Sequence, residues 1–212
     1  MEVTWLGHSC FRLKGKEAVL ITDPFDTSLG YSLGKPSADI VTVSHPHPNH
    51  ANVDGVGGTP HPVEGPGEYE ISGVFISSIR TFHDDEGGRR LGKNTVYVIE
   101  MDDLRVCHLG DLGHVPSSQQ VEEISPVDIL LVPVGGVTTI GAAEAAETIG
   151  LLDPKIVVPM HYRTEAIGLD LESPERFLKE MGLKELAPQP RLMVTKSNLP
   201  EVRQVILLDY RR

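Results

Sequence analysis

Short apolar runs separated by glycines and charged residues fill the first half of the chain, a pattern typical of β-strands joined by turns. The run 40–43 is almost continuously apolar, as in a strand that is buried on both faces. The stretch 61–80 contains Gly65-Pro66-Gly67 and Ser72-Gly73, so it divides into more than one strand. The other strands predicted in this half cover residues 2–6, 10–13, 18–22, 39–44, and a hairpin of 95–101 with 104–108.

The second half alternates between apolar strands and helical segments. Residues 141–152 are rich in alanine and glutamate, which favour helix, and Ser173-Pro174 is a typical helix start. The predicted helices are 117–124, 141–152 and 173–181, and the predicted strands are 128–133, 155–159, 192–195 and 205–208. The polar, glycine-rich stretch 84–93 is predicted to be an exposed loop rather than a linker. Residues 1–212 are therefore expected to form a single α/β domain with helices covering sheet faces.

Composition and charge narrow the classes of function. The chain has 212 residues, of which 40% are hydrophobic and 23% charged, as in an ordinary soluble domain. The net charge of -11 disfavours a nucleic-acid-binding surface but allows a small anionic substrate, because a bound metal reverses the local field. The sequence predicts no membrane span and no export signal, so a cytoplasmic location follows by default. Cys10 and Cys107 are predicted to be buried in strands rather than bridged, and a homo-oligomer stays open.

Three histidines, His45, His47 and His50, fall within six residues directly after the buried strand. His45 and His47 are two positions apart, so both rings project from the same face of an extended segment. Neutral imidazole is the commonest protein ligand for zinc and related metals. This pattern predicts a metal site, with a histidine-rich surface loop as the alternative.

Further ligand-type residues also stand where apolar strands end. They are Asp23, His83, Asp111 and His161. One such case is common by chance. Together with the strand end before His45, however, the pattern recurs at five strand ends. A zinc site needs three or four groups of this kind. The recurrence indicates that the metal site is built from segments far apart in the sequence.

In their order along the chain, these residues resemble the motifs of the metallo-β-lactamase superfamily of metal-dependent hydrolases. The segment Gly7-His8-Ser9-Cys10-Phe11 and the block 153–162 are similar to its ascorbate-6-phosphate-lactonase-like branch. The segment His45-x-His47-x-Asn49-His50 matches the signature His-x-His-x-Asp-His with one departure. The resemblance implies a four-layer αββα sandwich with the metals at one edge, between the two sheets.

The resemblance also implies a role for each residue. It gives His45, His47 and His83 to a first metal and position 49, His50 and His161 to a second. Asp111 would bridge the two ions. Asp23 would not bind a metal itself but would hold a metal ligand in its orientation. The implied cofactor is one or two zinc ions, although manganese or iron accepts the same ligands.

Asn49 departs from the aspartate of the family signature. An asparagine oxygen coordinates a metal weakly, and the amide cannot act as a base. The second site is therefore predicted to be weaker than the first, or empty at ordinary metal levels. Of the two catalytic positions, 49 and 111, only Asp111 could then serve as a base.

Two other histidines and one loop are candidates for a place in the pocket. His8 lies in the opening turn and is expected either near the metal pocket, supporting a ligand or contacting substrate, or in a purely structural role. His114 follows Asp111 by three residues and could contact substrate. The loop 138–141 precedes a predicted helix, whose N-terminus could bind an anion.

The resemblance implies a hydrolase whose metal-bound hydroxide attacks a lactone, ester or phosphoester bond of a small anionic metabolite. The substrate rests on analogy, because a fold does not determine its function. A nuclease or phosphodiesterase of the same superfamily is one alternative, which the acidic charge and short chain disfavour. A non-catalytic metal- or ligand-binding protein is the other, which Asn49 keeps open.

Overall fold

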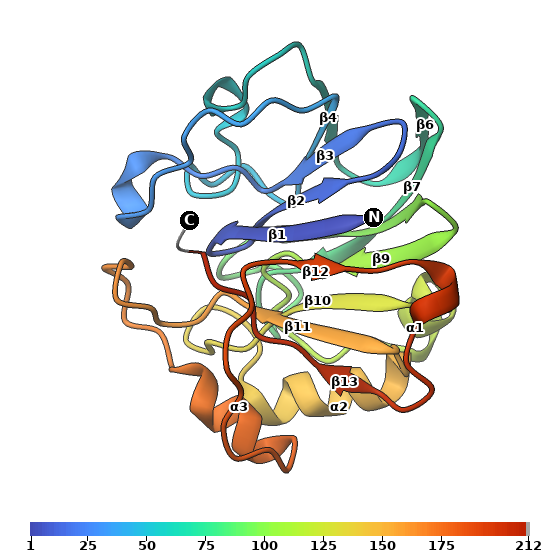
Figure 1. The fold of residues 1–212 in the computed structure, drawn as a ribbon. Coiled ribbons are helices and arrows are strands. Elements are labelled where there is room, and N and C mark those ends of the chain that lie inside the picture. Colours follow the sequence, from blue (N-terminus) through green and yellow to red (C-terminus); the bar gives the residue numbers. More distant parts are fainter. Residues whose placement is uncertain (211–212) are drawn as a thin grey trace.

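The computed structural model describes residues 1–210, which form two β-sheets packed face to face (Figure 1). The first sheet holds most of the N-terminal strands, and a short C-terminal strand pairs with its edge. In spatial order it consists of β12 (Leu192–Met193), β1 (Glu2–Gly7), β2 (Cys10–Lys14), β3 (Val19–Thr22), β4 (Ile40–Val43) and β5 (His61–Glu64). The last three strands are parallel, so β3 and β4 end at the same edge.

The second sheet follows the rest of the chain. In spatial order it consists of β13 (Gln204–Val205), β11 (Ile156–Met160), β10 (Ile129–Pro133), β9 (Leu104–His108), β8 (Lys93–Met101), β7 (Val74–Phe82) and β6 (Gly67–Ile71). Strands β10 and β11 are buried along their whole length because layers cover both of their faces. Strand β7 alternates between buried and more exposed positions, which is the period of two expected near an edge.

Three α-helices cover the outer face of the second sheet (Figure 1). They are α1 (Ser118–Ile124), α2 (Ala142–Leu152) and α3 (Pro174–Glu180). Helix α1 begins at a capping box in which Ser117 and Gln120 satisfy each other's backbone N–H groups. Helix α3 begins at a proline, whose missing N–H is not needed in the first turn. All three predicted helices are confirmed to within one residue at each end.

The outer face of the first sheet is covered differently. Its apolar side chains pack against the segment 25–38, which includes the short 3-10 helix η1 (Thr27–Leu29), and against Val56, Ile167 and Leu171. Among the described residues, no α-helix lies on this face. The fold is the mixed α/β sandwich that the sequence predicted, with loops and 3-10 turns as its fourth layer.

The C-terminal strand is shorter than predicted. Strand β13 comprises only Gln204–Val205, whereas the sequence predicted 205–208. The N–H of Ile206 still donates to the Val157 carbonyl on β11, and beyond it Leu208 forms a bridge with Gln189 instead of extending the strand. Residues 206–208 are buried. No helix in the described part of the chain is long and apolar enough to cross a membrane.

Hydrogen bonds between the two sheets hold one edge of the sandwich together. The buried Tyr97 hydroxyl, on β8, donates to the carbonyls of Val43 and Val63 in the first sheet. The N–H of Thr95 donates to the Ser44 carbonyl just beyond β4. Residues that follow β4 are thereby fixed against the second sheet, at the edge where the predicted metal ligands lie.

Candidate metal centre

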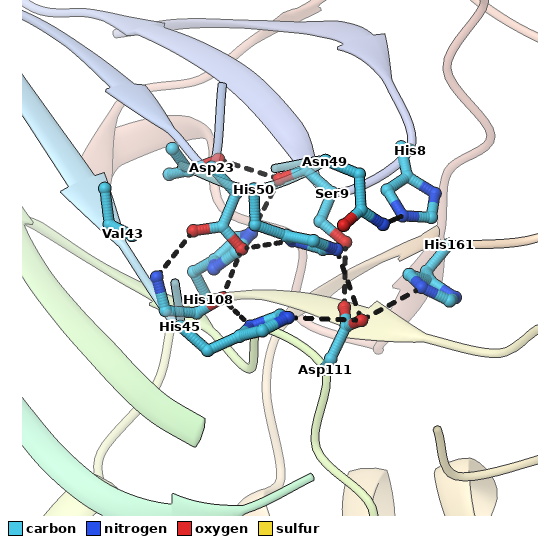
Figure 2. A network of polar contacts seen from close by, with 12 residues as sticks. His8, Ser9, Asp23, Val43, His45, Asn49, His50, His108, Asp111 and His161 are labelled. Atoms are coloured by element: carbon cyan, nitrogen blue, oxygen red, sulfur yellow. Dashed lines mark hydrogen bonds and ion pairs between the residues drawn. The ribbon is translucent and has the colours of Figure 1, made fainter. Parts of the chain in front are cut away.

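The ends of six strands deliver the predicted site residues to this edge. From the first sheet come His8 after β1, Asp23 after β3, and the segment 45–50 after β4. From the second sheet come His83 after β7, Asp111 after β9 and His161 after β11. The strands β1 and β11 are tied there, because the N–H of His161 donates to the carbonyl of His8. Figure 2 shows several of these side chains converging.

The side chains form two adjacent groups. Each residue offers one atom that could bind a metal, a ring nitrogen of histidine or a carboxylate oxygen of aspartate. Within each group, these atoms all lie within 4.8 Å of one another. The first group is His45, His47 and His83, and the second is His8, His50, Asp111 and His161. His47 is the more exposed member of the first group, whereas the second group is wholly buried. The structure therefore brings together every histidine and aspartate that was predicted as a metal ligand, and it adds His8.

Asp111 stands at the junction of the two groups. Its Oδ2 atom lies 3.1 Å from Nε2 of His161, 3.2 Å from that of His50, 3.4 Å from that of His83 and 3.9 Å from that of His45. One carboxylate oxygen thus faces imidazoles of both groups. This arrangement fits the bridging role that the resemblance implied for Asp111.

Asp23 orients the imidazoles of His50 and His45, the first directly and the second through Ser44. It accepts hydrogen bonds from the backbone N–H of Ser44 at 2.8 Å, from the Ser44 hydroxyl and from Nδ1 of His50 at 3.0 Å. Because its hydrogen goes to Asp23, the Ser44 oxygen accepts from Nδ1–H of His45 at 2.9 Å. His45 then carries its lone pair on Nε2, on the side of Asp111. His50 turns its Nε2 to the same side, where a lone pair becomes available once that nitrogen loses its proton (Figure 2).

The donor set fits a metal ion. Nε2 of His45 is buried and has no hydrogen-bond partner among the described residues. A buried lone pair without a partner is costly, and a cation would satisfy it. Imidazole and carboxylate are donors that zinc, iron and manganese accept.

Burial and the neighbouring charges set the protonation of the site. Burial and the adjacent His50 lower the pKa of His45 to about 3, so its ring is neutral at pH 7. Burial also opposes a charge on His50, but Asp111 and Asp23 raise the pKa of that imidazole to about 10. Burial would raise the pKa of Asp111, yet His161 and His50 hold it well below its usual range. A metal ion that binds His50 would therefore displace a proton and find an anionic Asp111.

Backbone geometry places Asp111 at the junction. The Asp111 N–H donates to Oδ1 of Asn94 at 2.9 Å, and the hydroxyl of Ser9 donates to Oδ1 of Asp111 at 3.3 Å. Gly110 adopts a left-handed conformation with φ of 57°. A Cβ on Gly110 would lie 2.4 Å from Oδ1 of Asn94 and 2.6 Å from Cβ of Ser44. Only glycine fits at this position without moving the groups that hold Asp111 and His45.

We expect Gly110→Ala to weaken metal binding and to destabilise the protein by more than the roughly 1–2 kcal/mol that left-handed backbone costs a residue with a Cβ. The additional loss comes from the steric clash with Asn94 and Ser44. Gly34→Ala is the matched control, because Gly34 has φ of 68° and no atom within 4 Å of the added Cβ. Urea unfolding and metal titration of both variants measure the difference. Equal effects of the two substitutions would contradict the steric explanation.

Asn49 lies beside His8 rather than between the two groups. Its side-chain Nδ2 donates to Nε2 of His8 at 3.3 Å, and Asn49 is half-buried. His8 itself is fully buried, with its ring centroid 4.1 Å from that of His161 and 4.9 Å from that of His50. Burial and the nearby His161 lower the pKa of His8 well below its usual range, so the ring is neutral.

His114 is held by the backbone. Its Nε2 accepts from the N–H of Phe82 at 3.3 Å, and its Nδ1 donates to the carbonyl of Val115 at 2.9 Å. The backbone thus engages both ring nitrogens in this structure, and a substrate contact by His114 stays a prediction. The side chain instead fixes the segment that follows Asp111 against the end of β7.

The loop 84–93 contains a buried carboxylate. Asp84 accepts hydrogen bonds of 2.7–2.9 Å from four backbone N–H groups, those of Glu86, Gly88, Arg90 and Leu91. The N–H of Leu91, with the other three, lowers the pKa of Asp84 well below its usual range. The loop was predicted to be exposed, and it is exposed except around this residue, which orders it next to His83.

Sequence reasoning missed three polar residues of the site. Ser44 orients His45, Ser9 contacts the oxygen of Asp111 that faces away from the histidines, and Asn94 positions the Asp111 backbone. Ser44 had a signal in the sequence, since a hydroxyl stands next to a candidate ligand. Asn94 had none, because its contacts join strands only through tertiary packing.

Comparison with known proteins agrees with this geometry. Residues 2–161 match the family model of the β-lactamase superfamily domain. The chain is 31% identical, over 214 residues, to the UPF0173 metal-dependent hydrolase of Pyrococcus horikoshii, with 87% of this chain and 93% of that protein covered. The similarity extends beyond the metal motifs, because it spans nearly the whole of both proteins.

Solved structures share the fold. A proposed zinc-dependent hydrolase of the metallo-β-lactamase superfamily from Thermotoga maritima is 40% identical, with a TM-score of 0.81 over 98% of this chain and 97% of that one. A diiron β-hydroxylase from Streptomyces venezuelae is 13% identical, with a TM-score of 0.65 over 92% of this chain and 54% of that one, and shows likeness of fold alone. The chain therefore belongs to the metallo-β-lactamase superfamily and, within it, to the UPF0173 metal-dependent hydrolases.

Proposed function

We propose that this hydrolase cleaves an ester, lactone or phosphoester bond of a small anionic metabolite. The observation that carries the proposal is the position of Asp111, whose Oδ2 lies within 4 Å of imidazoles from both histidine groups. Such a centre suits hydrolysis, because metal ions held there would polarise a carbonyl or phosphoryl oxygen and make water acidic enough to attack at neutral pH. Zinc, as one or two ions, is the metal that we propose.

The side chains of the centre would bind the ions, accept a proton and orient the imidazoles. His45, His47 and His83 would hold one ion, and His50 and His161 would hold the other, with Asp111 shared between them. Asp111 has one oxygen toward the histidines and accepts the Ser9 hydroxyl with the other, so its carboxylate stays anionic for the ions to share. With a single ion bound, the oxygen that faces Ser9 would be the one able to accept a proton. Asp23 and Ser44 would keep two of the imidazoles in the correct tautomer.

A cavity of about 330 Å³ beside His83 supports an anionic substrate. Its walls include Arg90 and the loop 138–141, which leads into the N-terminus of α2. A guanidinium and the positive end of a helix both favour a phosphate or carboxylate. Two of the three acidic residues in the walls are engaged elsewhere: Asp84 holds the backbone of its own loop, and Glu144 caps α2.

The test of the proposed function is hydrolysis by the metal-loaded protein. Activated carboxylic esters, lactones and bis-nitrophenyl phosphate are assayed after loading with zinc, manganese or iron. His47→Ala is expected to lower turnover by at least about 100-fold, since loss of a group behind a metal ligand already costs roughly 10–100-fold. His61→Ala is the matched control, because His61 is an exposed histidine on β5 and belongs to neither group.

The outcomes separate the alternatives. Turnover that disappears in His47→Ala but persists in His61→Ala supports the hydrolase. Cleavage of RNA without turnover of the small substrates would favour a nuclease. Metal binding with no turnover of any substrate would favour a non-catalytic binding protein. A cytoplasmic location stays a prediction from the sequence, and a homo-oligomer stays open.

A further inference from the structure

His8 occupies a place in the buried group that the family signature does not account for. Its donor atom lies within 4.8 Å of those of His50, Asp111 and His161. Its ring is the nearest described imidazole to His161, with centroids 4.1 Å apart. The side chain is fully buried, although no carboxylate of residues 1–210 forms an ion pair with it. A buried imidazole among metal ligands has the chemistry of a ligand itself.

The backbone at His8 is held in an unusual conformation. His8 has φ of 51°, which a residue with a Cβ rarely adopts. Its carbonyl accepts from the indole N–H of Trp5 at 2.9 Å and from the backbone N–H of His161 at 3.2 Å. These bonds join the turn after β1 to the end of β11. They fix the backbone of His8 beside His161, so this part of the site is already ordered when a cation binds.

The contact with Asn49 shows which nitrogen is available. The Asn49 amide donates to Nε2 of His8, so Nε2 carries a lone pair, and Figure 2 shows this nitrogen turned toward Asn49. A cation could take the place of that weak hydrogen bond. An aspartate at position 49, as in the family signature, would instead supply an anionic oxygen.

We propose that His8 is a ligand of the second metal ion and takes the place that the signature gives to an aspartate at position 49. The second ion would then be held by His8, His50, His161 and the shared Asp111. Asn49 would lie beside this set as a hydrogen-bond donor. The inference rests on the proposed metal centre, and it revises the expectation that Asn49 leaves the second site weak or empty.

The exchange of a carboxylate for an imidazole has a consequence for metal choice. Three imidazoles would face each ion, and Asp111 would be the one carboxylate among the two groups. Imidazole suits zinc and iron, whereas carboxylate-rich sites suit manganese. The second site is therefore expected to prefer Zn²⁺ to Mn²⁺, and Asn49→Asp is expected to reduce that preference.

The test is a titration of the metal-free full-length chain with Zn²⁺ in competition with a chromophoric chelator. The wild-type protein is expected to bind two equivalents. In His8→Ala and His8→Gln the first equivalent should bind unchanged. The second should bind at least about 100-fold more weakly, beyond the roughly 10–100-fold typical of residues behind the ligands. The glutamine variant keeps much of the side-chain volume, and circular dichroism reports whether each variant is folded. His61→Ala, outside both groups, should bind like the wild type.

A rescue distinguishes a ligand from a structural residue. Adding Asn49→Asp to His8→Ala should restore the second equivalent, because the family's aspartate then returns to the site. Absence of this rescue would show that loss of His8 acted through the fold and would overturn the proposal. A second equivalent that binds equally well with and without His8 would overturn it as well, as would a wild-type protein that takes only one. Binding of no metal at all would instead defeat the proposed function.

Discussion

Asp111→Asn is expected to abolish the binuclear centre and to lower metal-supported hydrolysis by more than about 100-fold, beyond the roughly 10–100-fold typical of residues behind the ligands. The amide keeps the shape of the side chain but lacks the charge that two cations would share. Asp111 also balances the proton on His50, whose pKa its carboxylate raises. Without metal, removal of this buried partner should cost about 3–5 kcal/mol of unfolding free energy.

Metal titration, hydrolysis assays and urea unfolding in the presence of a chelator measure these effects. Asp153→Asn is the control, because Asp153 is an exposed residue that ends α2 in a left-handed conformation that asparagine tolerates. It should leave metal binding and hydrolysis unchanged. Two tightly bound ions in a folded Asp111→Asn variant would show that the histidines alone hold the metals, and the bridging role would be wrong.

Asp23→Ala is expected to reduce metal affinity by about 10–100-fold without removing a ligand. The substitution deletes the acceptor for the Ser44 N–H, the Ser44 hydroxyl and Nδ1 of His50, all of them buried. Each buried donor left without an acceptor should cost about 1–3 kcal/mol of unfolding free energy. His45 and His50 would both lose the hydrogen bonds that select their tautomers.

Asp26→Ala serves as the control for Asp23→Ala. Asp26 lies on the same loop and accepts from Ser28 at the start of η1, outside the metal centre. Its loss should remove the cap of η1 and leave metal affinity unchanged. If a folded Asp23→Ala variant bound metal as tightly as Asp26→Ala, packing alone would orient the two imidazoles.

Both predictions depend on the fact that each sheet supplies a different part of the metal centre. Asp23 and Ser44 belong to the first sheet and aim imidazoles toward the interface, whereas Asp111 reaches the same point from the second. The Thr95-to-Ser44 and His161-to-His8 backbone bonds hold the two sheets in register at this edge. The site is therefore sensitive to substitutions such as Gly110→Ala that shift one sheet edge against the other.

The sequence alone determined the α/β class and the order of nearly all the strands and helices. The reason is local: apolar runs, turn residues and helix starts report on their own segment. It also identified Asp23, His45, His47, His50, His83, Asp111 and His161 as residues of one edge. That inference needed only strand ends and a resemblance, because the ligand-type residues follow β-strands whose ends lie together.

Only the tertiary structure decided how the side chains at that edge meet. It placed His8 against His161 and turned Asn49 toward His8, bound both ring nitrogens of His114 to the backbone, and linked Ser44 to both Asp23 and His45. It also showed that loops, not α-helices, cover the first sheet over the described residues. These contacts join segments up to 153 positions apart, such as His8 and His161. No local pattern encodes them, because they depend on how the two sheets pack and on which polar atoms that packing buries together.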